Sequence, residues 1–466
     1  MLENIIAFIN DALYSYILII VLVLGGIYFT VRLKFAQFRL LPEQFRAVTE
    51  KPKDGKGVSS FQALMVSTAS RVGTGNIIGV STAICLGGFG SVFWMWLIAI
   101  VGSASAFIES TLAQIYKKKG TDGSYGGPAY YIEAALKSRG LALVFSVFLI
   151  LTYGVGFNML ASFNLQSTFS AYGFYDEKTS PFIIGLILAV IVAYCLLGGG
   201  SRIIKVTSLL VPVMGIAYVL VALIIIVMNI TVLPEVFVRI FKEAFDFTAI
   251  FGGFSGSCVM YGIKRGLFSN EAGVGSAPNA SASAEVSHPA KQGLVQVLSV
   301  FIDTIVICSA TAFMCMCSGV EPSPELSGAA YIQAALKNVL GSFGPIFITV
   351  AMILFAFTTL LGNLYYVDKC LAYILKKEPS KLFMTVYRII ASILIFIGSG
   401  LSADLLWNIA DITMGGMAVI NMPVILILGK YAIRALKDYE TKLKHTDTPE
   451  FKAADIGIPH KTDYWN

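Results

Sequence analysis

Long apolar runs recur along the chain, and short polar segments separate them. A helix of ~20 apolar residues crosses a bilayer, and such runs suit helices, not barrel strands. The pattern predicts eleven spans, which lie at residues 12–31, 59–86, 90–116, 142–171, 182–198, 206–228, 248–264, 293–318, 344–374, 384–400 and 405–433. The chain is therefore expected to be an all-α polytopic membrane protein.

Two of the predicted spans contain residues that a membrane helix disfavours. The second span reads S-R-V-G-T-G-N-I at residues 70–77, and the seventh reads G-G-F-S-G-S at residues 252–257. Irregular backbone at membrane depth persists only where it is buried in protein or lines a cavity. We therefore expect discontinuous helices at both places. The alternative is that the glycines only permit close helix packing.

A short internal repeat relates the two halves of the chain. Residues 131–137 read Y-I-E-A-A-L-K and residues 331–337 read Y-I-Q-A-A-L-K, so six of seven positions are identical. Five predicted spans separate the copies, an odd number, so the copies face opposite sides of the membrane. This is the arrangement of a five-plus-five inverted repeat, in which the first helix of each half is often broken. Chance is the alternative, because Ala and Leu are common in helices.

Basic residues set the expected orientation. With eleven spans, the basic clusters after spans one, three, five, seven and nine and after the last span fall on one side, which the positive-inside rule makes cytoplasmic. The N-terminus is then outside and the C-terminus inside, in a plasma-membrane protein. Arg239 and Lys242, in an outer loop, are the exception. The net charge of +6 has this origin and gives no indication of nucleic-acid binding.

These observations divide the chain into four parts. Residues 1–57 form a peripheral N-terminal helix and a basic cytoplasmic segment, and residues 58–230 form the first five-helix repeat. Residues 231–436 form the second repeat, and residues 437–466 form a polar cytoplasmic tail that is expected to be mobile.

The break in the second span has a definite chemistry. Gly75 and Asn76 open a new half-helix at residues 76–86, whose free N–H groups and positive dipole end suit a carboxylate. The preceding half-helix ends near Val72, where unpaired carbonyl oxygens suit a cation. One break thus offers an anion site beside a cation site. This combination fits a zwitterionic amino acid together with a sodium ion.

Charged residues inside the spans need partners, because they are costly in lipid. They are Arg71, Glu109, Asp303, Asp404 and Asp411. Arg71 is expected to pair with Glu109 or Asp303, either as a gate or as a static ion pair. Asp404 and Asp411 are expected to lie at the interface between membrane and water. Lys264 and Arg265 are expected to end the seventh span in a solvated cytoplasmic position.

Several blocks carry a family resemblance. They are V-G-T-G-N-I-I-G-V (72–80), G-S-V-F-W-M-W-L-I-A (90–99), G-G-P-A-Y-Y-I (126–132), G-I-K-R-G-L-F-S-N-E-A-G-V-G-S-A-P (262–278), L-L-G-N-L-Y-Y-V-D-K-C (360–370) and W-N-I-A-D (407–411). Through them the whole chain resembles the alanine/glycine:cation symporter family, of sodium:alanine symporter type. The resemblance implies a leucine-transporter-type fold with a peripheral N-terminal helix, and cotransport of a small neutral amino acid with sodium.

The resemblance also implies site residues. The substrate carboxylate would meet the backbone at Gly73, Thr74, Gly75 and Asn76, with the Asn76 amide as a further contact. The substrate amino group would meet carbonyl oxygens at Ser255, Gly256 and Ser257. Sodium would bind the carbonyl oxygens of Ala69 and Val72 and the hydroxyls of Thr358 and Thr359. Helix–helix hydrogen bonding is the alternative for the two threonines.

Two departures from the family pattern bear on the substrate. In the fourth span Ala161 and Phe163 replace a glutamine and an asparagine, and in the ninth span Asn363 replaces a tryptophan. If Asn363 lines the pocket, the pocket is roomier and more polar, and glutamine or serine becomes an alternative substrate. Coupling to protons is an alternative to coupling to sodium. Asn158, Ser162 and Gln166 form a polar stripe at helical spacing, which suits a face toward the bundle or toward water. Asn158, Ser162 and Asn363 are therefore expected to contact the substrate, with polar packing between helices as the alternative for the stripe.

Other functions lack support in the residues. A channel needs polar stripes on many helices. An intramembrane protease would have to use Ser276 and His288, without an identifiable third group. No Walker motif is found, so an ion gradient must drive transport. One sodium ion crossing ~100 mV supplies about 2.3 kcal/mol, which allows about 50-fold accumulation of a neutral solute. The seven cysteines lie mostly in apolar runs and read as free thiols.

Overall fold

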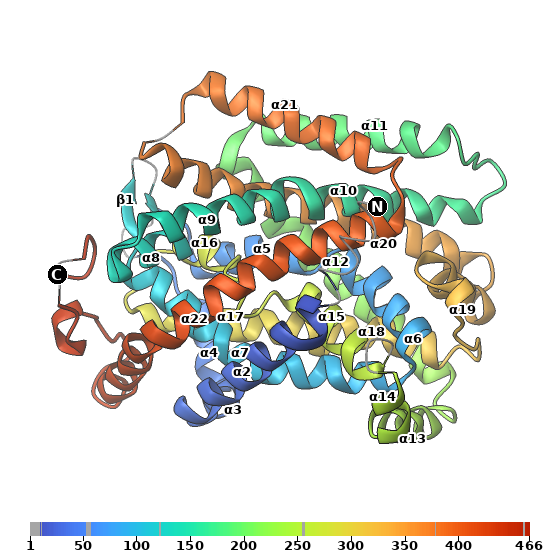
Figure 1. The fold of residues 1–466 in the computed structure, drawn as a ribbon, viewed down its shortest axis with the longest axis horizontal. Helices are drawn as coiled ribbons and strands as arrows, with labels where there is room; N and C mark the ends of the chain where they lie inside the picture. Colours follow the sequence, from blue (N-terminus) through green and yellow to red (C-terminus); the bar gives the residue numbers. More distant parts are fainter. Residues whose placement is uncertain are drawn as a thin grey trace.

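The computed structural model describes residues 10, 12–52, 57–120, 123–253, 257–377, 379–459 and 462–466. Its long helices lie side by side along one direction (Figure 1). The first half contains η1 (Leu13–Leu18), α2 (Ile19–Arg32), α3 (Ala36–Arg39), α4 (Leu41–Val48), α5 (Ser60–Arg71), η2 (Gly75–Gly79), α6 (Val80–Gly87), α7 (Gly90–Ile115), β1 (Lys118–Gly120), β2 (Gly123–Tyr125), α8 (Pro128–Leu136), α9 (Arg139–Leu149), η3 (Ile150–Gly156), α10 (Phe157–Ser167), η4 (Thr168–Ala171), α11 (Ser180–Leu196) and α12 (Gly199–Met228).

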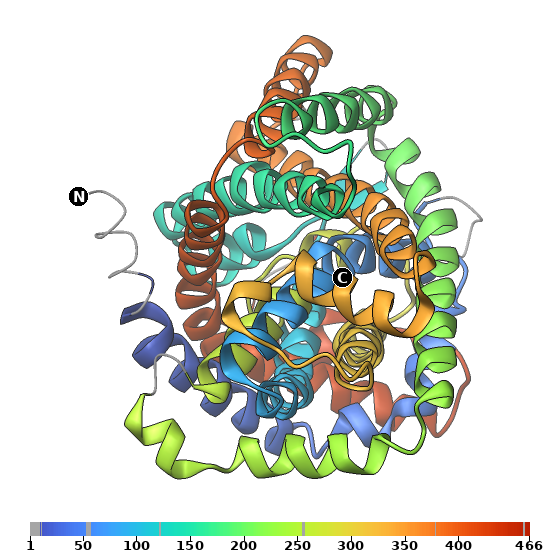
Figure 2. The same ribbon diagram turned by 90° about the vertical axis from the view of Figure 1, so that its right-hand side faces the viewer.

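The second half begins with an amphipathic helix and ends with a short tail. It contains α13 (Leu233–Ala244), α14 (Phe247–Gly252), α15 (Cys258–Asn270), α16 (Pro278–Ser281), α17 (Pro289–Val300), η6 (Phe301–Cys308), α18 (Ser309–Met316), η7 (Pro324–Leu326), α19 (Ala329–Leu340), α20 (Phe343–Leu375), α21 (Lys381–Gly398), α22 (Ala403–Leu443) and η8 (Ala453–Ile456). Helix α13 lies across one end of the bundle, roughly at right angles to the long helices (Figure 2).

Seven helices among the described residues are long and apolar enough to cross a membrane. They are Gly90–Ile115, Arg139–Ala171, Gly199–Met228, Pro289–Met316, Phe343–Leu375, Lys381–Gly398 and Ala403–Leu443. Shorter apolar helices run over Ile19–Arg32, Gly75–Gly87 and Ser180–Leu196. The fold is thus that of an all-helical membrane protein, as expected. The count of eleven spans stays a prediction.

Burial separates an inner group of helices from an outer one. The inner helices α5, α7, α15 and α17 are buried on nearly every side. The outer helices α11, α12 and α21 expose large apolar side chains such as Ile183, Leu209 and Ile389. Apolar residues on an exposed face suit contact with lipid. The inner helices therefore hold whatever site the protein has.

The internal repeat has the geometry that an inverted repeat requires. Its first copy begins at Tyr131 in α8 and its second at Tyr331 in α19. Helix α8 lies at the left-hand end of the bundle and α19 at the right-hand end (Figure 1). The prediction that the copies face opposite sides is confirmed.

The predicted seventh span, 248–264, is wrong in its bounds. Helix α14 ends at Gly252, and Gly252 and Gly253 are exposed. The long buried helix α15 begins only at Cys258 and continues past Lys264 and Arg265 to Asn270. The pair of basic residues does not end this helix, because both side chains find an acidic partner, Asp411, inside the protein.

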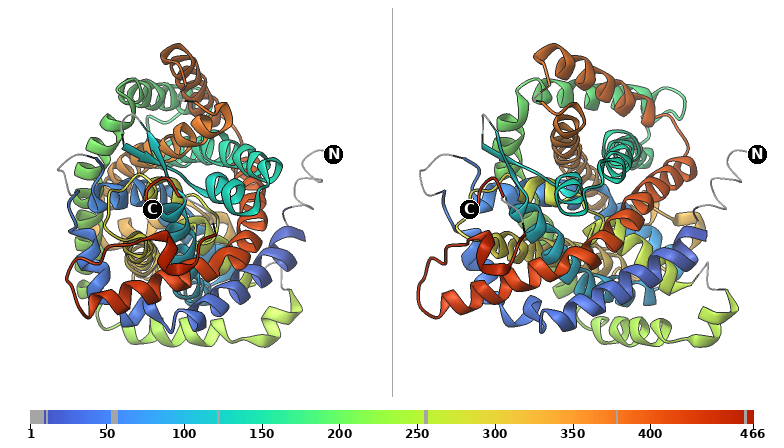
Figure 3. Two further views of the ribbon diagram at one scale, coloured as in Figure 1. Left: turned by 90° about the vertical axis from the view of Figure 1, so that its left-hand side faces the viewer. Right: turned by 60° about the vertical axis from the view of Figure 1, so that its left-hand side comes forward.

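The tail packs against the protein, contrary to the expectation of a mobile extension. Phe451 and Trp465 are buried, and the Trp465 indole donates a hydrogen bond to the Gln114 carbonyl (2.7 Å). Asp463 forms an ion pair with Lys118 (3.0 Å). Strands β1 and β2 and the C-terminus lie at the same end of the bundle (Figure 3). Aromatic side chains at the end of the tail thus anchor it where α7 ends.

Candidate functional site

The first helix break lies where the sequence predicts it. Helix α5 starts with a capping box between Ser59 and Gln62 and ends at Arg71, and Val72 is its C-cap. Helical structure resumes at Gly75. The Gly73 N–H donates to Oδ1 of Asn76 (2.8 Å), which closes the turn. The start of η2 presents backbone N–H groups that have no carbonyl one turn earlier.

A second break faces the first, but it lies farther along the seventh span than expected. Helix α15 ends at Asn270, and the next residue, Glu271, adopts a left-handed conformation (φ 52°). Gly273 (φ 83°) and Gly275 (φ 91°) follow, in conformations that glycine adopts without strain. The side chains of Ser70 and Glu271 lie 3.4 Å apart, and a Cβ on Gly75 would lie 2.6 Å from Phe268. The two breaks are therefore in contact.

The two breaks carry the same sequence pattern. Gly73-Thr74-Gly75 and Gly273-Val274-Gly275 are separated by 200 positions, from 73 to 273. The repeat copies at Tyr131 and Tyr331 have the same separation. The break in the second half could therefore have been found from the sequence. The prediction instead placed the second break at the glycine-rich residues 252–257.

The expected ligands on the earlier glycine run are not brought to the breaks. Ser257 caps the far end of α15 by accepting a hydrogen bond from the Met260 N–H. Thirteen helical residues separate it from Glu271, which is about 20 Å along the axis. Ser255 and Gly256 lie outside the described residues. The part of the second half that contacts the first break is the segment after Asn270, through the Glu271 side chain.

The Asn76 side chain ties the break to neighbouring segments. Its amide nitrogen donates to Oδ1 of Asp303 (2.6 Å) and to the Ser269 hydroxyl (2.9 Å). Ser269 and Thr304 in turn donate to the other oxygen of Asp303 (2.6 and 2.8 Å). This side chain was expected to contact the substrate. In the structure it holds η2, α15 and η6 together instead.

A small pocket lies at the first break. Its cavity volume is only about 10 Å³, and it is lined by Ser70, Arg71, Gly73, Thr74, Gly75, Phe157, Phe268 and Thr359. Polar residues of the break lie on one side of it and two phenylalanine rings lie on the other. This lining has the chemistry that an α-amino acid with a short side chain requires, and the helices must move apart to enlarge the cavity before such a ligand fits.

An aromatic layer separates this pocket from a wide vestibule. The Phe268 ring lies 4.5 Å from Phe157 and 4.8 Å from Trp407, between ring centroids. Trp407 lines the vestibule, whose volume is about 920 Å³. The vestibule opens toward α19 and α6, at the end of the bundle opposite the tail. The three rings therefore form a lid between the vestibule and the pocket.

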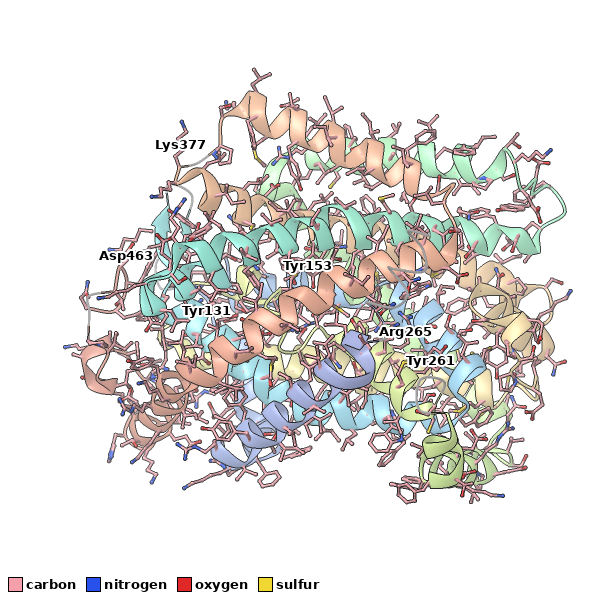
Figure 4. The ribbon with its side chains drawn as sticks, viewed as in Figure 1. Tyr131, Tyr153, Tyr261, Arg265, Lys377 and Asp463 are labelled. Carbon is pink, nitrogen blue, oxygen red and sulfur yellow. The ribbon has the colours of Figure 1, made fainter. Side chains whose placement is uncertain are left out.

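Charged residues lie directly above this lid. The Arg265 guanidinium lies over the Trp407 ring, 3.9 Å from its centroid, and near the middle of the molecule (Figure 4). Asp411 is buried and accepts contacts from Lys264 (2.9 Å) and Arg265 (3.3 Å). The expectation that Lys264, Arg265 and Asp411 reach solvated interface positions is wrong, because all three are buried and Asp411 pairs with both cations inside the protein. Asp404 is exposed at the vestibule.

Three of the four expected sodium ligands, Ala69, Val72 and Thr359, lie at the same break, whereas the Thr358 hydroxyl lies beside Met214 of α12. The Thr359 hydroxyl is buried without a hydrogen-bond partner, and it would lie 2.1 Å from a Cβ on Gly73. The Thr358 hydroxyl donates to the Leu354 carbonyl (3.0 Å). Ala69 and Val72 are buried at the end of α5. An orphaned hydroxyl beside the free carbonyls of a helix end is a donor set of hard oxygens, which fits sodium.

The polar residues of the fourth span also face the bundle, as expected. Asn158, Ser162 and Gln166 are all buried. Asn363 donates to Oδ1 of Asn158 (2.9 Å) and accepts from Ser70 (2.6 Å). Asn363 therefore braces α5, α10 and α20, and it is not among the residues that line the small pocket. Asn164, which was not among the predicted site residues, donates to the Thr74 hydroxyl (3.1 Å).

Arg71 has a different partner from the one expected. Its guanidinium donates to Gln296 (2.8 Å) and forms no ion pair within 4.0 Å with Glu109 or Asp303. It still acts electrostatically on both carboxylates and on Glu271. All four side chains are buried. Arg71 is therefore shared among three acidic groups.

The residues considered for hydrolysis do not meet. The Ser276 hydroxyl donates to Glu271 (2.6 Å), whereas His288 lies 3.1 Å from Asp438. Within the described ranges no group of three His, Cys, Asp or Glu side chains could hold a metal ion, and the seven cysteines are buried free thiols. The paired helix breaks in an inverted repeat, which contact each other and adjoin a small pocket, are typical of a secondary transporter instead.

The chain belongs to the sodium:alanine symporter family, whose model matches residues 1–453. It is 43% identical over 456 residues to the amino-acid carrier protein AlsT of Bacillus subtilis (strain 168), covering 98% of this chain and 96% of the relative. It is 44% identical over 453 residues to the probable sodium/glutamine symporter GlnT of the same organism, covering 97% and 93%. Families of this kind are transporters and not enzymes.

Further comparisons agree in fold and family. The chain is 37% identical over 433 residues to the sodium/alanine symporter AgcS of Methanococcus maripaludis, covering 90% of this chain and 93% of the relative. Its structure is similar to that of MhsT in complex with L-phenylalanine, with a TM-score of 0.57 at 15% identity. That match covers 82% of this chain and 96% of MhsT. The fold is of the leucine-transporter type.

Proposed function

We propose that this protein couples inward sodium movement to uptake of a small neutral amino acid of the alanine or glycine type. The amino acid lies in the pocket between the two breaks, and alternating access follows from rocking of the helices around it. Its carboxylate meets the N–H groups at Thr74 and Gly75. Its amino group meets carbonyl oxygens of the segment after Asn270.

One observation carries this proposal: the two Gly-x-Gly breaks face each other beside the unpaired hydroxyl of Thr359. The break at Gly73 exposes amide donors on one side and the carbonyl groups of the α5 end on the other. Sodium binds the carbonyl oxygens of Ala69 and Val72 and the hydroxyls of Thr358 and Thr359. The sodium site and the amino-acid site then share the backbone of one short segment, which couples their occupancy.

The orientation follows from the basic residues. The end of the bundle that holds β1, β2 and the tail also carries Lys118, Arg139, Lys376 and Arg434. By the positive-inside rule this end lies in the cytoplasm, and the vestibule opens to the outside. The protein is then a plasma-membrane transporter with its N-terminus outside and its C-terminus inside. The proposal also includes the four parts of the chain: the N-terminal segment (1–57), the two five-helix repeats (58–230 and 231–436) and the tail (437–466).

A larger substrate such as glutamine is the second candidate. The relative named as a probable sodium/glutamine symporter favours it. The geometry favours alanine, because Asn363 is engaged by Ser70 and Asn158 and because Phe157 and Phe268 close the pocket. Asn363 in place of a tryptophan therefore does not enlarge the pocket in the arrangement seen here.

The test is uptake into proteoliposomes of labelled alanine, glycine, serine and glutamine, each with and without an inward sodium gradient. We expect sodium-dependent uptake of alanine or glycine. Sodium-dependent uptake of glutamine alone would reassign the substrate and keep the mechanism. Equal uptake with sodium and with potassium gradients would remove sodium coupling, and a proton gradient would then be tested in its place.

A further inference from the structure

Three buried carboxylates share one cation near the first break. Glu109, Glu271 and Asp303 are each at most 1% exposed, and the cation that acts on all three is Arg71, at 2%. A carboxylate without a compensating charge is very costly in such surroundings. Arg71 offsets one carboxylate, and the cotransported sodium ion of the proposed function offsets a second. The third is neutralised either by a proton or by the excess positive charge of Lys264 and Arg265 over Asp411, and its hydrogen bonds distinguish the two.

Hydrogen bonding distinguishes the three carboxylates. Asp303 accepts from Asn76, Ser269 and Thr304, so both of its oxygens are satisfied in the ionised form. Glu271 accepts from Ser276 at 2.6 Å and from Ser70 at 3.4 Å, again one donor to each oxygen.

Glu109 has the fewest side-chain donors, with the Gly273 backbone as its other neighbouring donor. Oε2 accepts from the Asn421 amide (2.9 Å), and Oε1 is buried without a hydrogen-bond partner. Hydrogen bonds to the ionised form hold a carboxylate in that form, and their absence favours the protonated acid. Of the three groups, Glu109 is therefore the one that the surroundings keep neutral.

The groups around Glu109 add one positive charge and one negative charge. Arg71 acts on it from α5, and Glu271 from the end of α15. Tyr131 from α8 and Tyr366 from α20 are the other titratable neighbours. From α22 the facing group is the neutral Asn421.

The partner of Arg71 is also neutral, because its guanidinium donates a hydrogen bond to Gln296 of α17. Nε and Nη2 of Arg71 have no hydrogen-bond partner, so Arg71 is not committed to one carboxylate.

Glu109 is also linked to the second break. The Asn421 amide that donates to Glu109 donates at the same time to the carbonyl oxygen of Gly273 (2.9 Å). The Tyr131 hydroxyl donates to the same amide group (2.5 Å), which fixes its orientation. The Gly273 backbone also lies beside the Glu109 carboxyl group. A change of charge on Glu109 therefore changes the electrostatic potential and the hydrogen bonding at Gly273, where the seventh span is broken.

We propose that Glu109 is a proton-binding site whose occupancy is coupled to the break at Gly273. The inference rests on the proposed function, because it counts one sodium ion in the charge balance. The carboxylate takes one proton from water when the site is open and carries it as a neutral acid while the site is buried. No electron moves, and the proton returns to water when the site opens again.

The test uses the full chain in proteoliposomes with a fixed sodium gradient and a series of pH values on both sides. Wild-type uptake is expected to fall several-fold toward alkaline pH, because ionised Glu109 is not reburied. In Glu109→Gln, which stays neutral, whatever uptake remains is expected to be independent of pH. Asn421→Ala removes the hydrogen bond to the carboxylate, so the fall should move to higher pH. The control Glu133→Gln, near the surface beside Tyr373, should keep the wild-type profile.

Infrared difference spectroscopy gives a readout that does not need transport. The carbonyl band of a protonated carboxyl should titrate in the wild type and be missing in Glu109→Gln. An unchanged band together with an unchanged alkaline fall in that variant would overturn the proposal. If the wild type shows no sodium-driven uptake at any pH, the proposed function fails, whereas the band still decides whether Glu109 binds a proton. If Glu109→Gln does not fold, Asn421→Ala tests the proposal instead: the carboxyl band should then titrate at a higher pH than in the wild type, and an unchanged titration would overturn the proposal.

Discussion

Asn76 donates a hydrogen bond of 2.6 Å to Asp303, so one short amide ties the first helix break to the eighth predicted span. The same nitrogen reaches Ser269, near the end of α15. A residue expected to touch the substrate instead fixes three segments around the pocket. The break is therefore held in a definite shape before any ligand binds, which lowers the cost of ordering it on binding.

Replacing Asn76 by Asp should disrupt the pocket. The new carboxylate would face Asp303 without a donor between them, and an uncompensated buried charge destabilises by about 3–5 kcal/mol. We expect a lower thermal transition and loss of uptake. The control Asn466→Asp, at an exposed position where the side-chain oxygen still accepts from the Thr462 N–H, should leave both unchanged. Normal uptake by Asn76→Asp would contradict the role given to this amide.

Gly362 allows α20 to approach α5. A Cβ at this position would lie 2.6 Å from the backbone nitrogen of Ser70, a contact that no side-chain rotation relieves. Gly362→Ala should cost about 1–3 kcal/mol of stability through overpacking, and it should reduce uptake by displacing the end of α5.

The matched control for Gly362 is Gly253→Ala, because nothing lies within 4 Å of a Cβ at Gly253. Thermal unfolding in detergent and uptake in liposomes measure both variants. A strong loss of uptake in Gly253→Ala would restore the glycine run at 252–257 as part of the site.

Thr359→Val removes the unpaired hydroxyl and keeps the shape of the side chain. The sodium concentration that gives half-maximal uptake should rise about tenfold or more, which corresponds to about 1.4 kcal/mol of lost binding free energy. Thr385→Val on the outer helix α21 is the control, since its hydroxyl is bonded to the Lys381 carbonyl. An unchanged sodium dependence in Thr359→Val would place the cation elsewhere.

Asp411→Asn should affect stability more than Asp404→Asn. Asp411 is the buried partner of both Lys264 and Arg265, so its loss leaves two buried cations without compensation, at a cost of about 3–5 kcal/mol. Asp404 is exposed, and its replacement should change stability by less than about 0.5 kcal/mol. Thermal unfolding measures the loss of stability in both variants. Equal losses would contradict the pairing of Asp411 with Lys264 and Arg265.

The packing of the tail should weaken in acid. His288 is buried between the rings of Tyr439 and Phe451, and this burial lowers the pKa of His288 below 6.5 despite the neighbouring Asp438. The neutral ring is then the form that fits. The stabilisation is complete above 6.5 and is lost as the pH falls through the lowered value.

Hydrogen exchange of residues 451–459 at about pH 5 and pH 8 measures this effect. Protection factors, which correct for the faster intrinsic exchange at high pH, should be smaller at the lower pH in the wild type. His288→Gln does not titrate, so the difference between the two pH values should shrink. Equal protection at both pH values in the wild type would show that the titration of His288 does not control the packing of the tail.

Much of the fold follows from the order of residues alone. Long apolar runs predict helices, and the odd number of spans between Tyr131 and Tyr331 predicts copies at opposite ends. The seventh span was misplaced for a physical reason. Lys264 and Arg265 look like the end of a span until Asp411, 146 residues from Arg265, is known to lie beside them. No local pattern contains a partner at that distance.

The first break could be predicted because glycine and asparagine weaken a helix, and an apolar run rarely contains both without a break in the backbone. The second was missed although Gly273-Val274-Gly275 repeats the pattern of Gly73-Thr74-Gly75. The sequence contains two neighbouring glycine-rich segments, and only the structure shows that Gly252 and Gly253 are exposed whereas Gly273 and Gly275 are buried. Phe157, Phe268 and Trp407 read as ordinary apolar residues in sequence. Their role as a lid depends on contacts among three separate helices.

The most direct test of the central claim is an experimental structure of the full chain with alanine and sodium bound. We expect alanine between Gly73–Gly75 and Phe268, with its carboxylate at the start of η2, and sodium between the end of α5 and Thr359. Alanine bound only in the vestibule above Trp407, or sodium away from Thr359, would contradict the account.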